Sequence, residues 1–343
     1  MPIPIFADAD VCLILLANHR RMVISNDVFI LKVLWSQTLA NNNHRSVLLG
    51  VVAAVCVLFF WTGWIVISRL GVTSHLTVYD VTGLRYSIGA AVALPYIIWR
   101  RAWRGLTPGR TLVLTLTSGV PYALLSYFGL TYAPAAHGGV FLNGCLPIFT
   151  TLFGWLWLGQ KGRFSQIVGL GIILIGVTLV GYEGFVSSGG GMTWLGDVLF
   201  LAAIALFAVF MVVNRVWTIT PGQVIFAVTI VSAVFYIPVW LLWLDSNLTV
   251  APASEILLQG AYQGLVPGVL GISCLNVAVR HIGARVTSVF LSAVPVVAAL
   301  AAIPILQEMP GLPAWIGMGI VTVGILLALG IVGLNQNAAA AGE

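Results

Sequence analysis

Arg85 is a charged residue inside a strongly apolar stretch of the chain, where a charge costs on the order of 2.5–3.5 kcal/mol. Its guanidinium could bind an anionic group of a substrate. It could instead snorkel outward, cap helix carbonyls or pair with Asp80. Tyr122 lies on a polar helix face with two serines at i, i+4 and i+8, and Tyr127 flanks that face. This chemistry is typical of solute binding.

The carboxamide of Asn143 lies just before Pro147 in another apolar stretch. Because lipid offers it no hydrogen-bond partner, we expect Asn143 to face the protein interior or a cavity. An interhelical hydrogen bond, worth about 0.6 kcal/mol, is the alternative. We expect Pro147, and Pro295 later in the chain, to bend their helices at a gate.

Three glycines recur every four residues beside two polar side chains. Gly260, Gly264 and Gly268 predict a groove for close helix packing. Gln263 and the adjacent Tyr262 are candidates for substrate contact at that groove.

Two further residues are candidates by position. Trp61 lies near the middle of an apolar stretch, where its indole suits the wall of a pocket for apolar or cationic ligands, although core packing explains it equally. His137 begins another stretch and could act as a proton-sensitive gate or as a hydrogen-bonding residue at the membrane interface.

The sequence predicts no catalytic residue, metal site or cofactor. The four cysteines have neither metal-ligand nor disulfide spacing, and the HExxH and GxSxG motifs are absent. Tyr79-Asp80 and Gly196-Asp197 faintly resemble the YD and GxGD motifs of intramembrane aspartyl proteases. That pattern breaks at Trp194, which occupies the position of the first glycine.

The elements that carry these residues are membrane helices. The chain is 60% hydrophobic and 7% charged, with a mean hydropathy of +1.05, which excludes a soluble domain and argues against a nucleic-acid-binding protein. Segments long enough to span a bilayer as helices recur ten times. We place them at 47–70, 77–99, 111–132, 136–158, 165–183, 194–214, 222–243, 257–279, 285–307 and 313–334.

The second half of the chain repeats the pattern of the first. VFLNGCLP ends at Pro147 and VFLSAVP ends at Pro295, and from each proline a Gln or Glu and three glycines follow at distances of 13, 22, 24 and 29 residues. Gly50 and Arg69 recur 146 positions later. Two five-helix repeats have opposite topology in a membrane, which predicts an inverted repeat with a binding site between the halves.

The distribution of basic residues predicts the orientation. With cytoplasmic termini, 13 of the 15 lysines and arginines lie on the inner side. The expected organisation is an N-terminal cytoplasmic extension (1–46), in which 22–39 could form an interfacial helix, a first repeat (47–183), an outer linker (184–193), a second repeat (194–334) and a cytoplasmic tail (335–343). Translation could start at Met1 or Met22.

Several motifs resemble the EamA-type branch of the drug/metabolite transporter superfamily, over about residues 50–182 and 194–331. They are FFWTGWIVISRLG, GLRY, APAAHGGVFLNGCLPIFTTLFGWLWLGQK and VTSVFLSAVPVVAALAAIPILQE. The resemblance implies an all-α membrane protein with ten transmembrane helices that transports by alternating access, with spans 1, 3, 4, 6, 8 and 9 lining the cavity. One departure is that Gln160 stands where the second copy keeps Glu308.

We therefore predict an inner-membrane exporter of a small organic solute such as a metabolite, amino acid or drug. The alternatives are a lipid or lipid-linked sugar flippase and, from another class, an intramembrane aspartyl protease. The expected partners are the solute and the bilayer, without nucleic acid. The sequence leaves open a coupling proton and the choice between monomer and homodimer.

Overall fold

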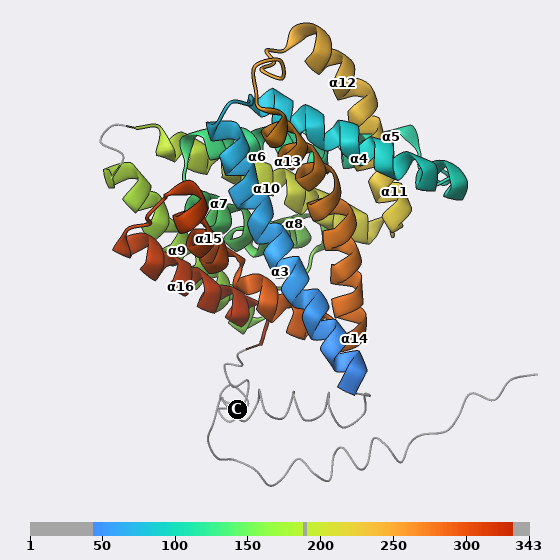
Figure 1. The fold of residues 1–343 in the computed structure, drawn as a ribbon. Helices are drawn as coiled ribbons and strands as arrows, with labels where there is room; N and C mark the ends of the chain where they lie inside the picture. Colours follow the sequence, from blue (N-terminus) through green and yellow to red (C-terminus); the bar gives the residue numbers. More distant parts are fainter. Residues whose placement is uncertain (1–43, 188–190, 332–343) are drawn as a thin grey trace, which may run out of the picture. The chain divides into compact units, whose positions relative to one another are not determined.

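The computed structural model describes residues 44–187 and 191–331, and within those ranges it is helical with no strand (Figure 1). The predicted extension 1–46 and tail 335–343 therefore lie almost entirely outside the described residues. The first half of the chain contains α3 (His44–Thr73), α4 (Val78–Arg100), α5 (Pro108–Ser118), α6 (Val120–Tyr132), α7 (Ala135–Gly139), the π-helical η2 (Val140–Gly144), α8 (Leu146–Leu158) and α9 (Phe164–Ser187).

The second half contains α10 (Thr193–Val216), α11 (Pro221–Ile225), the π-helical η3 (Phe226–Val231), α12 (Ser232–Trp243), α13 (Ala253–Leu265), the π-helical η4 (Val266–Leu270), α14 (Gly271–Ser292), α15 (Val294–Leu306) and α16 (Leu312–Ala328). α9 continues to Ser187, into the segment 184–193 that the sequence assigned to the linker, and part of that segment lies outside the described residues.

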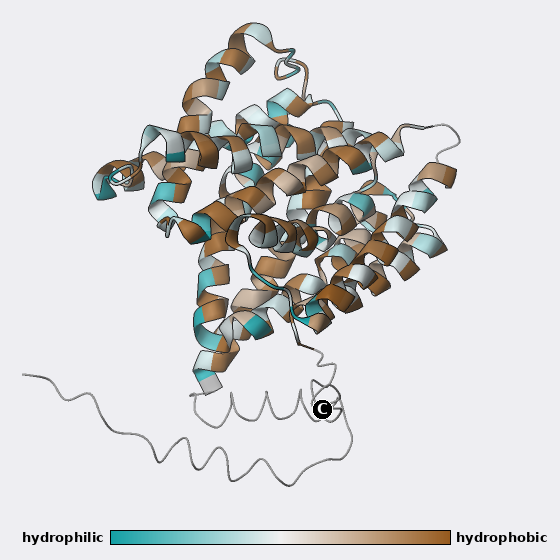
Figure 2. Ribbon diagram, turned by 180° about the vertical axis from the view of Figure 1, so that it is seen from behind, coloured by the Kyte–Doolittle hydropathy of each residue, from teal (hydrophilic) through white to brown (hydrophobic). Residues whose placement is uncertain are grey.

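Eight continuous helical stretches of the described chain are long and apolar enough to cross a membrane, and α15 and α16 are shorter apolar helices. The longest stretch, Ala253–Ser292, is interrupted at Gly283, whose φ of 81° and ψ of 154° are not helical. Figure 2 shows apolar residues along most of each helix, and large side chains such as Leu242, Trp243 and Phe235 are exposed. An apolar exterior of this extent is stable only in lipid, so the chain is a multi-pass membrane protein.

Each predicted helix-bending proline lies just after a break in its helix. Pro147 is the second residue of α8, and Pro295 is the second residue of α15. The residues before these helices, Cys145 and Ala293, have nearly the same backbone angles (φ −80° and −82°, ψ −13° and −8°). A proline fits the first turn of a helix because the missing N–H would have no partner there.

Glycines show how the two halves are related. α9 and α16 lie side by side (Figure 1) and run antiparallel. A Cβ at Gly169 would lie 2.8 Å from the Gly324 carbonyl oxygen, and one at Gly176 would lie 2.7 Å from that of Gly317. Because Gly317 and Gly324 are the repeat equivalents of Gly169 and Gly176, the two contacts are reciprocal, as a two-fold relation between repeats requires.

We name the ends of the bundle after two equivalent residues, Glu308 and Gln160. The Glu308 end contains the helix ends and connections near 69–80, 130–137, 183–197, 243–255 and 306–314. The Gln160 end contains those near 45–50, 100–110, 158–164, 215–221, 280–285 and 328–331. The predicted orientation makes the Gln160 end cytoplasmic.

Candidate functional site

A chain of polar side chains lies between four helices that belong to both repeats. α3, α4 and α6 come from the first repeat and α13 comes from the second. We call this group the Arg85 cluster, which consists of Trp64, Ser68, Arg85, Tyr127, Gln259 and Gln263. Arg85, Tyr127 and Gln263 are residues that the sequence predicted as substrate contacts, and the structure brings them together.

The Arg85 guanidinium points into the bundle. Its Nη1 donates to the Tyr127 hydroxyl at 3.2 Å, and its central carbon lies 5.9 Å from the Trp64 ring centroid and 6.0 Å from that of Tyr86. Cation–π contacts of this length favour a cation between aromatic rings. Among the described residues no carboxylate forms an ion pair with Arg85.

Asp80, which the sequence offered as a partner for Arg85, is engaged elsewhere. Its carboxylate accepts hydrogen bonds from Trp240 Nε1 (3.0 Å), Ser246 Oγ (2.6 Å) and the Asn247 N–H (2.9 Å). It also accepts one from the Thr77 N–H in a capping box at the start of α4. Asp80 therefore fixes α4 against the end of α12 and does not neutralise Arg85.

Gln263 connects the helices of the cluster. Its Oε1 accepts from the Tyr127 hydroxyl at 3.0 Å, and its Nε2 donates to Ser68 Oγ at 2.8 Å and to Gln259 Oε1 at 3.2 Å. Gln259 in turn donates to the Ile67 carbonyl of α3 at 2.6 Å. Since Gln263 is 2% exposed, loss of these bonds would cost about 1–3 kcal/mol for each group left without a partner.

Small residues allow α13 to approach α3 and α4 closely enough for these bonds. A Cβ at Gly71 would lie 2.5 Å from the Gln259 amide, and one at Gly264 would lie 3.0 Å from the Gly89 nitrogen. Gly260 also faces α4, at 3.4 Å from Ile88. Gly268 is different, because a Cβ there would meet no atom within 4 Å, and the close packing that we predicted at this position is not present.

Aromatic rings cover the cluster. Tyr122 stacks with Trp64 at a centroid distance of 6.2 Å and packs against Phe207 of α10 at 5.1 Å. Trp64 also donates through Nε1 to the Tyr127 hydroxyl at 3.5 Å. The predicted contact Tyr122 thus belongs to the wall of the cluster.

Three other predicted contacts lie outside the hydrogen-bonded cluster. Tyr262 donates to the Phe60 carbonyl at 3.1 Å and packs over Gly63, which joins α13 to α3. Asn143 donates to the Gly139 carbonyl of its own helical segment at 3.2 Å, so its amide partner is neither another helix nor the cluster. Trp61 is half-buried, with Nε1 near Gly271.

His137 is buried at the Glu308 end, where it contacts a carboxylate. Its Nδ1 is 2.8 Å from Asp197 Oδ1, and the two residues are 4% and 6% exposed. His137 comes from the start of α7 and Asp197 from the start of α10, so the pair joins the two repeats. His137 is therefore a buried residue with a fixed hydrogen-bond partner. Its two predicted roles, a proton-sensitive gate and a hydrogen-bonding residue at the membrane interface, stay predictions.

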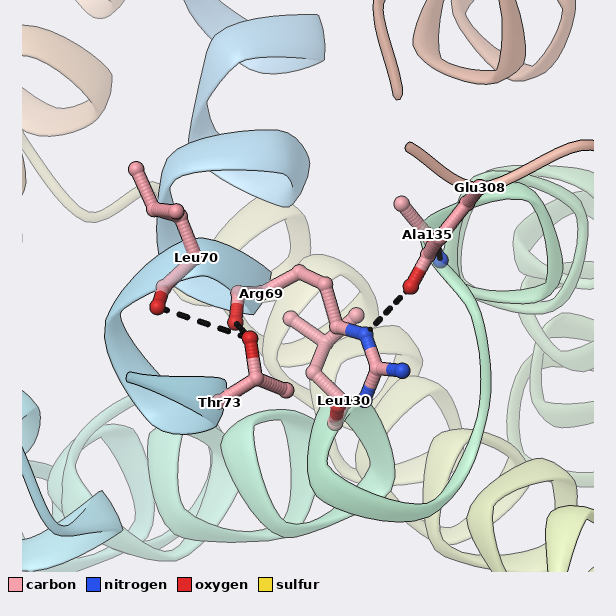
Figure 3. A network of polar contacts seen from close by, with 6 residues as sticks. All are labelled: Arg69, Leu70, Thr73, Leu130, Ala135 and Glu308. Atoms are coloured by element: carbon pink, nitrogen blue, oxygen red, sulfur yellow. Dashed lines mark hydrogen bonds and ion pairs between the residues drawn. The ribbon is translucent and has the colours of Figure 1, made fainter. Parts of the chain in front are cut away.

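Two further carboxylates join the repeats at the Glu308 end. Glu308 Oε1 is 2.7 Å from Arg69 Nε, and Glu308 Oε2 accepts from the Ala135 N–H at 2.8 Å (Figure 3). Arg69 also donates to the Leu130 carbonyl. Glu183, at the end of α9, accepts from the Gly311 N–H at 2.7 Å and from the Ala314 N–H at the start of α16. Carboxylates are stabilised at helix N-termini by the free N–H groups and the helix dipole.

A cavity of about 300 Å³ opens among these carboxylates. Its lining includes Pro134, His137, Glu183, Glu308 and Met309. It lies at the Glu308 end and is separate from the Arg85 cluster, whose side chains fill the space between their helices.

Comparisons with known proteins agree with this architecture. The sequence profile of the EamA-like transporter family matches residues 48–182 and again 194–330. The chain belongs to the EamA-like transporter family. The doubled pattern read from the sequence is therefore confirmed as two family repeats, and the resemblance to the drug/metabolite transporter superfamily is confirmed with it.

A relative of this EamA-like transporter is the uncharacterized transporter YyaM of Bacillus subtilis (strain 168). It is 24% identical over 285 residues, which span 76% of this chain and 90% of YyaM. A crystal structure is also similar, with a TM-score of 0.57 and 17% identity over 84% of this chain and 97% of the other. At that identity the likeness shows the fold alone.

Ser68, Gln259 and Trp64 are part of the cluster in this EamA-like transporter but were not among the predicted site residues. Each lies one helical turn from another member: Ser68 follows Trp64 by four residues, and Gln259 precedes Gln263 by four. A search for polar residues at i+4 spacing around Gln263 would have found Gln259.

Proposed function

We propose that this EamA-like transporter exports a small organic solute by alternating access, with the Arg85 cluster as its substrate site. The observation that carries the proposal is the position of the cluster between two repeats of a transporter family. Polar side chains deep in a membrane protein mark solute pathways because they are costly to retain there. Alternating access moves one repeat against the other around a site of this kind.

In the topology that we propose, the protein crosses the inner membrane ten times and has both termini in the cytoplasm. The non-helical Gly283 divides the stretch Ala253–Ser292 into two crossings, and α15 completes the second of them. This arrangement makes each repeat a five-helix unit and gives the repeats opposite topology. It also places the Gln160 end, with its basic residues, on the cytoplasmic side.

The mechanism that we propose starts from the closed Glu308 end. The cluster lies roughly 8–15 Å from the helix termini at that end, at 1.5 Å per residue along α3, α4, α6 and α13. The Arg69–Glu308 ion pair and the His137–Asp197 contact join the repeats between the cluster and the outside. A solute entering from the Gln160 end would replace the bonds that Gln263 and Tyr127 make with each other. Opening of the Glu308 end would then release it.

The rival functions have less support. Tyr127, Ser68 and Gln259 are 0–1% exposed, and an enclosed site of this kind suits a small solute better than a lipid or lipid-linked sugar. The two aspartates of the protease pattern contact different partners: Asp80 contacts α12 and its loop, and Asp197 contacts His137. They do not form a shared acid–base pair, so we propose no enzymatic activity.

A thermal-stability screen of the purified protein tests the site. The library should contain amino acids, nucleosides, sugars, organic acids and cationic drugs. A ligand at 100 times its dissociation constant should stabilise the protein by about 2.7 kcal/mol. The matched variants both replace a glutamine by alanine. Gln263→Ala changes the cluster, and Gln160→Ala changes an exposed glutamine of the first repeat.

We expect a compound that stabilises the native protein and the Gln160→Ala variant but not the Gln263→Ala variant. The same compound should be transported by the native protein in proteoliposomes. A compound that binds both variants equally would show that the binding site lies outside the cluster. A cooperatively melting protein that neither binds nor transports any member of the library would overturn the proposed function.

A further inference from the structure

We propose that the transported solute carries a negative charge, such as a carboxylate, which binds the Arg85 guanidinium, and a flat apolar body that packs against Trp64 and Tyr122. This inference rests on the proposed function and names the substrate class of the same site. It follows from the state of Arg85 in the described structure.

Arg85 is a cation whose charge is not neutralised by the described part of the protein. The nearest carboxylate candidate, Asp80, is held by Thr77, Trp240, Ser246 and Asn247, and none of the ion pairs of the described chain includes Arg85. The hydrogen-bond partner that it has is neutral, the Tyr127 hydroxyl. A guanidinium presents five N–H donors in a planar fork that matches a carboxylate with two parallel bonds. In the described chain one hydrogen bond of the fork goes to Tyr127, and an anion would reach the remaining N–H groups by displacing neighbouring side chains.

The surroundings of Arg85 disfavour a cationic ligand. A second cation would meet like charge in a region of low dielectric, where repulsion is strong. The closest side chains are aromatic or neutral: Trp64, Tyr86, Tyr127 and, beyond them, Tyr122. These rings offer flat apolar surface and hydroxyl groups, which suits an anion with an aromatic or other planar apolar body.

The charges at the Gln160 end support the same class of solute. Among the described residues, the basic side chains there are Arg45, Arg100, Arg101, Arg104, Arg110, Lys161, Arg163, Arg215, Arg280 and Arg285. All six described carboxylates lie instead near the Glu308 end: Asp80, Glu183, Asp197, Asp245, Glu255 and Glu308. A cationic entrance raises the local concentration of anions and increases their rate of entry.

The membrane potential would drive such an anion outward. For a univalent anion, a potential of 100 mV, negative inside, corresponds to roughly a 50-fold concentration ratio in favour of the outside. Export of an anion therefore requires no coupled proton, which agrees with the position of the described carboxylates near helix ends.

Acid and amide pairs test the charge directly. Each pair, such as N-acetyl-tryptophan and its amide, benzoate and benzamide, or 4-methylpentanoate and its amide, shares one body and differs in charge. The readouts are the shift in melting temperature and counterflow in proteoliposomes. We expect at least one acid to bind at least 10-fold more tightly than its amide. Arg85→Met should remove that preference, while Gln160→Ala, which leaves every charge of the bundle in place, should keep it.

Two further variants keep the test decisive if Arg85→Met does not fold. Arg85→Lys retains the charge but loses the planar fork, so it should keep part of the preference for acids. Tyr127→Phe retains the ring and should weaken acids and amides by a similar few-fold factor. Equal binding of acids and amides by the native protein, or an acid preference that survives Arg85→Met, would overturn the proposal.

The outcome also separates this inference from the proposed function. Transport of only neutral or cationic compounds, sensitive to Gln263→Ala, would overturn the anionic class and leave the transport site in place. Absence of binding and transport for compounds of every charge would overturn both.

Discussion

The Glu308 end and the Gln160 end occupy equivalent positions in the two repeats, yet only the first is held together by charge. Glu308 pairs with Arg69 and caps α7, whereas the equivalent Gln160 and Arg215 are both exposed and no ion pair joins them. In the described chain, the Arg69–Glu308 ion pair and the contacts of His75 with Glu255 and of His137 with Asp197 all join the repeats at the Glu308 end.

This difference has a simple electrostatic cause. The described Gln160 end contains ten basic residues and no carboxylate, so contact between the repeats there brings like charges together. Polar links that join the repeats at this end involve no carboxylate among the described residues, for example Ser46 with His281 at 2.7 Å and Gln223 with the Arg104 carbonyl at 2.9 Å. The comparison indicates that the Gln160 end opens more easily than the Glu308 end.

Among variants that compare the two ends, His137→Ala should cause the largest loss in the free energy of unfolding. The change leaves the buried Asp197 side chain without its His137 hydrogen-bond partner, which should cost about 3 kcal/mol. Thermal or urea unfolding in detergent measures the loss. His281→Ala, which removes a part-buried contact with Ser46 at the Gln160 end, should cost less than 1.5 kcal/mol. Equal losses would show that the two ends are held with similar strength.

The next largest difference in the free energy of unfolding should come from two equivalent glycines at which helices pack closely, Gly196 and Gly50. A Cβ at Gly196 would lie 2.8 Å from the Gly129 carbonyl oxygen and 2.9 Å from the Ala133 nitrogen, both backbone atoms. At the equivalent Gly50 the closest atoms, at 2.7 and 2.8 Å, belong to the side chains of Ile282 and His281.

The Ile282 methyl group can rotate away, whereas the His281 Cβ moves only with its backbone. We therefore expect Gly196→Ala to lower the free energy of unfolding by about 2–3 kcal/mol and Gly50→Ala by about 1–2 kcal/mol. Unfolding of both variants under the same conditions measures the difference. A larger effect at Gly50 would contradict the proposed order.

Glu308→Gln makes the two ends alike. Glu308 accepts from Arg69 through one oxygen and from the Ala135 N–H through the other. A glutamine keeps one acceptor oxygen and turns an NH2 donor toward the other partner, so we expect a loss of about 2 kcal/mol. The functional effect should exceed this cost, because the variant would open more often at the Glu308 end. Labelling of a cysteine introduced at buried Ala302, which lines the cavity at this end, should become faster. Unchanged labelling would show that Glu308 does not hold this end closed.

Gln160→Glu should have the smallest effect on stability. It adds a carboxylate among the basic residues of the Gln160 end, where an exposed ion pair is worth about 0.2–1 kcal/mol. Because a new attraction would close this end, we expect slower entry of solute, seen as a several-fold lower efflux rate in proteoliposomes at unchanged expression. Gln160→Ala is the control. Efflux at the native rate in both variants would mean that opening of this end does not limit transport.

The sequence alone determined the class of the protein and its symmetry. Apolar segments of spanning length can only be helices in lipid, and the spacing from Pro147 and Pro295 revealed the two repeats that the family comparison confirms. It also identified Arg85, Tyr127 and Gln263 as unusual, because a polar residue within an apolar segment can be recognised from the sequence alone.

Only the tertiary structure decided which polar groups meet. Asn143 and Gln263 look alike in the sequence, yet one bonds to Gly139 in its own segment and the other joins three helices. The physical reason is that residues facing lipid and residues facing neighbouring helices are both apolar here, so periodicity marks the faces of these helices weakly. Helix rotation, and with it the pairing of Glu308 with Arg69, is set by glycine contacts between segments far apart in the chain.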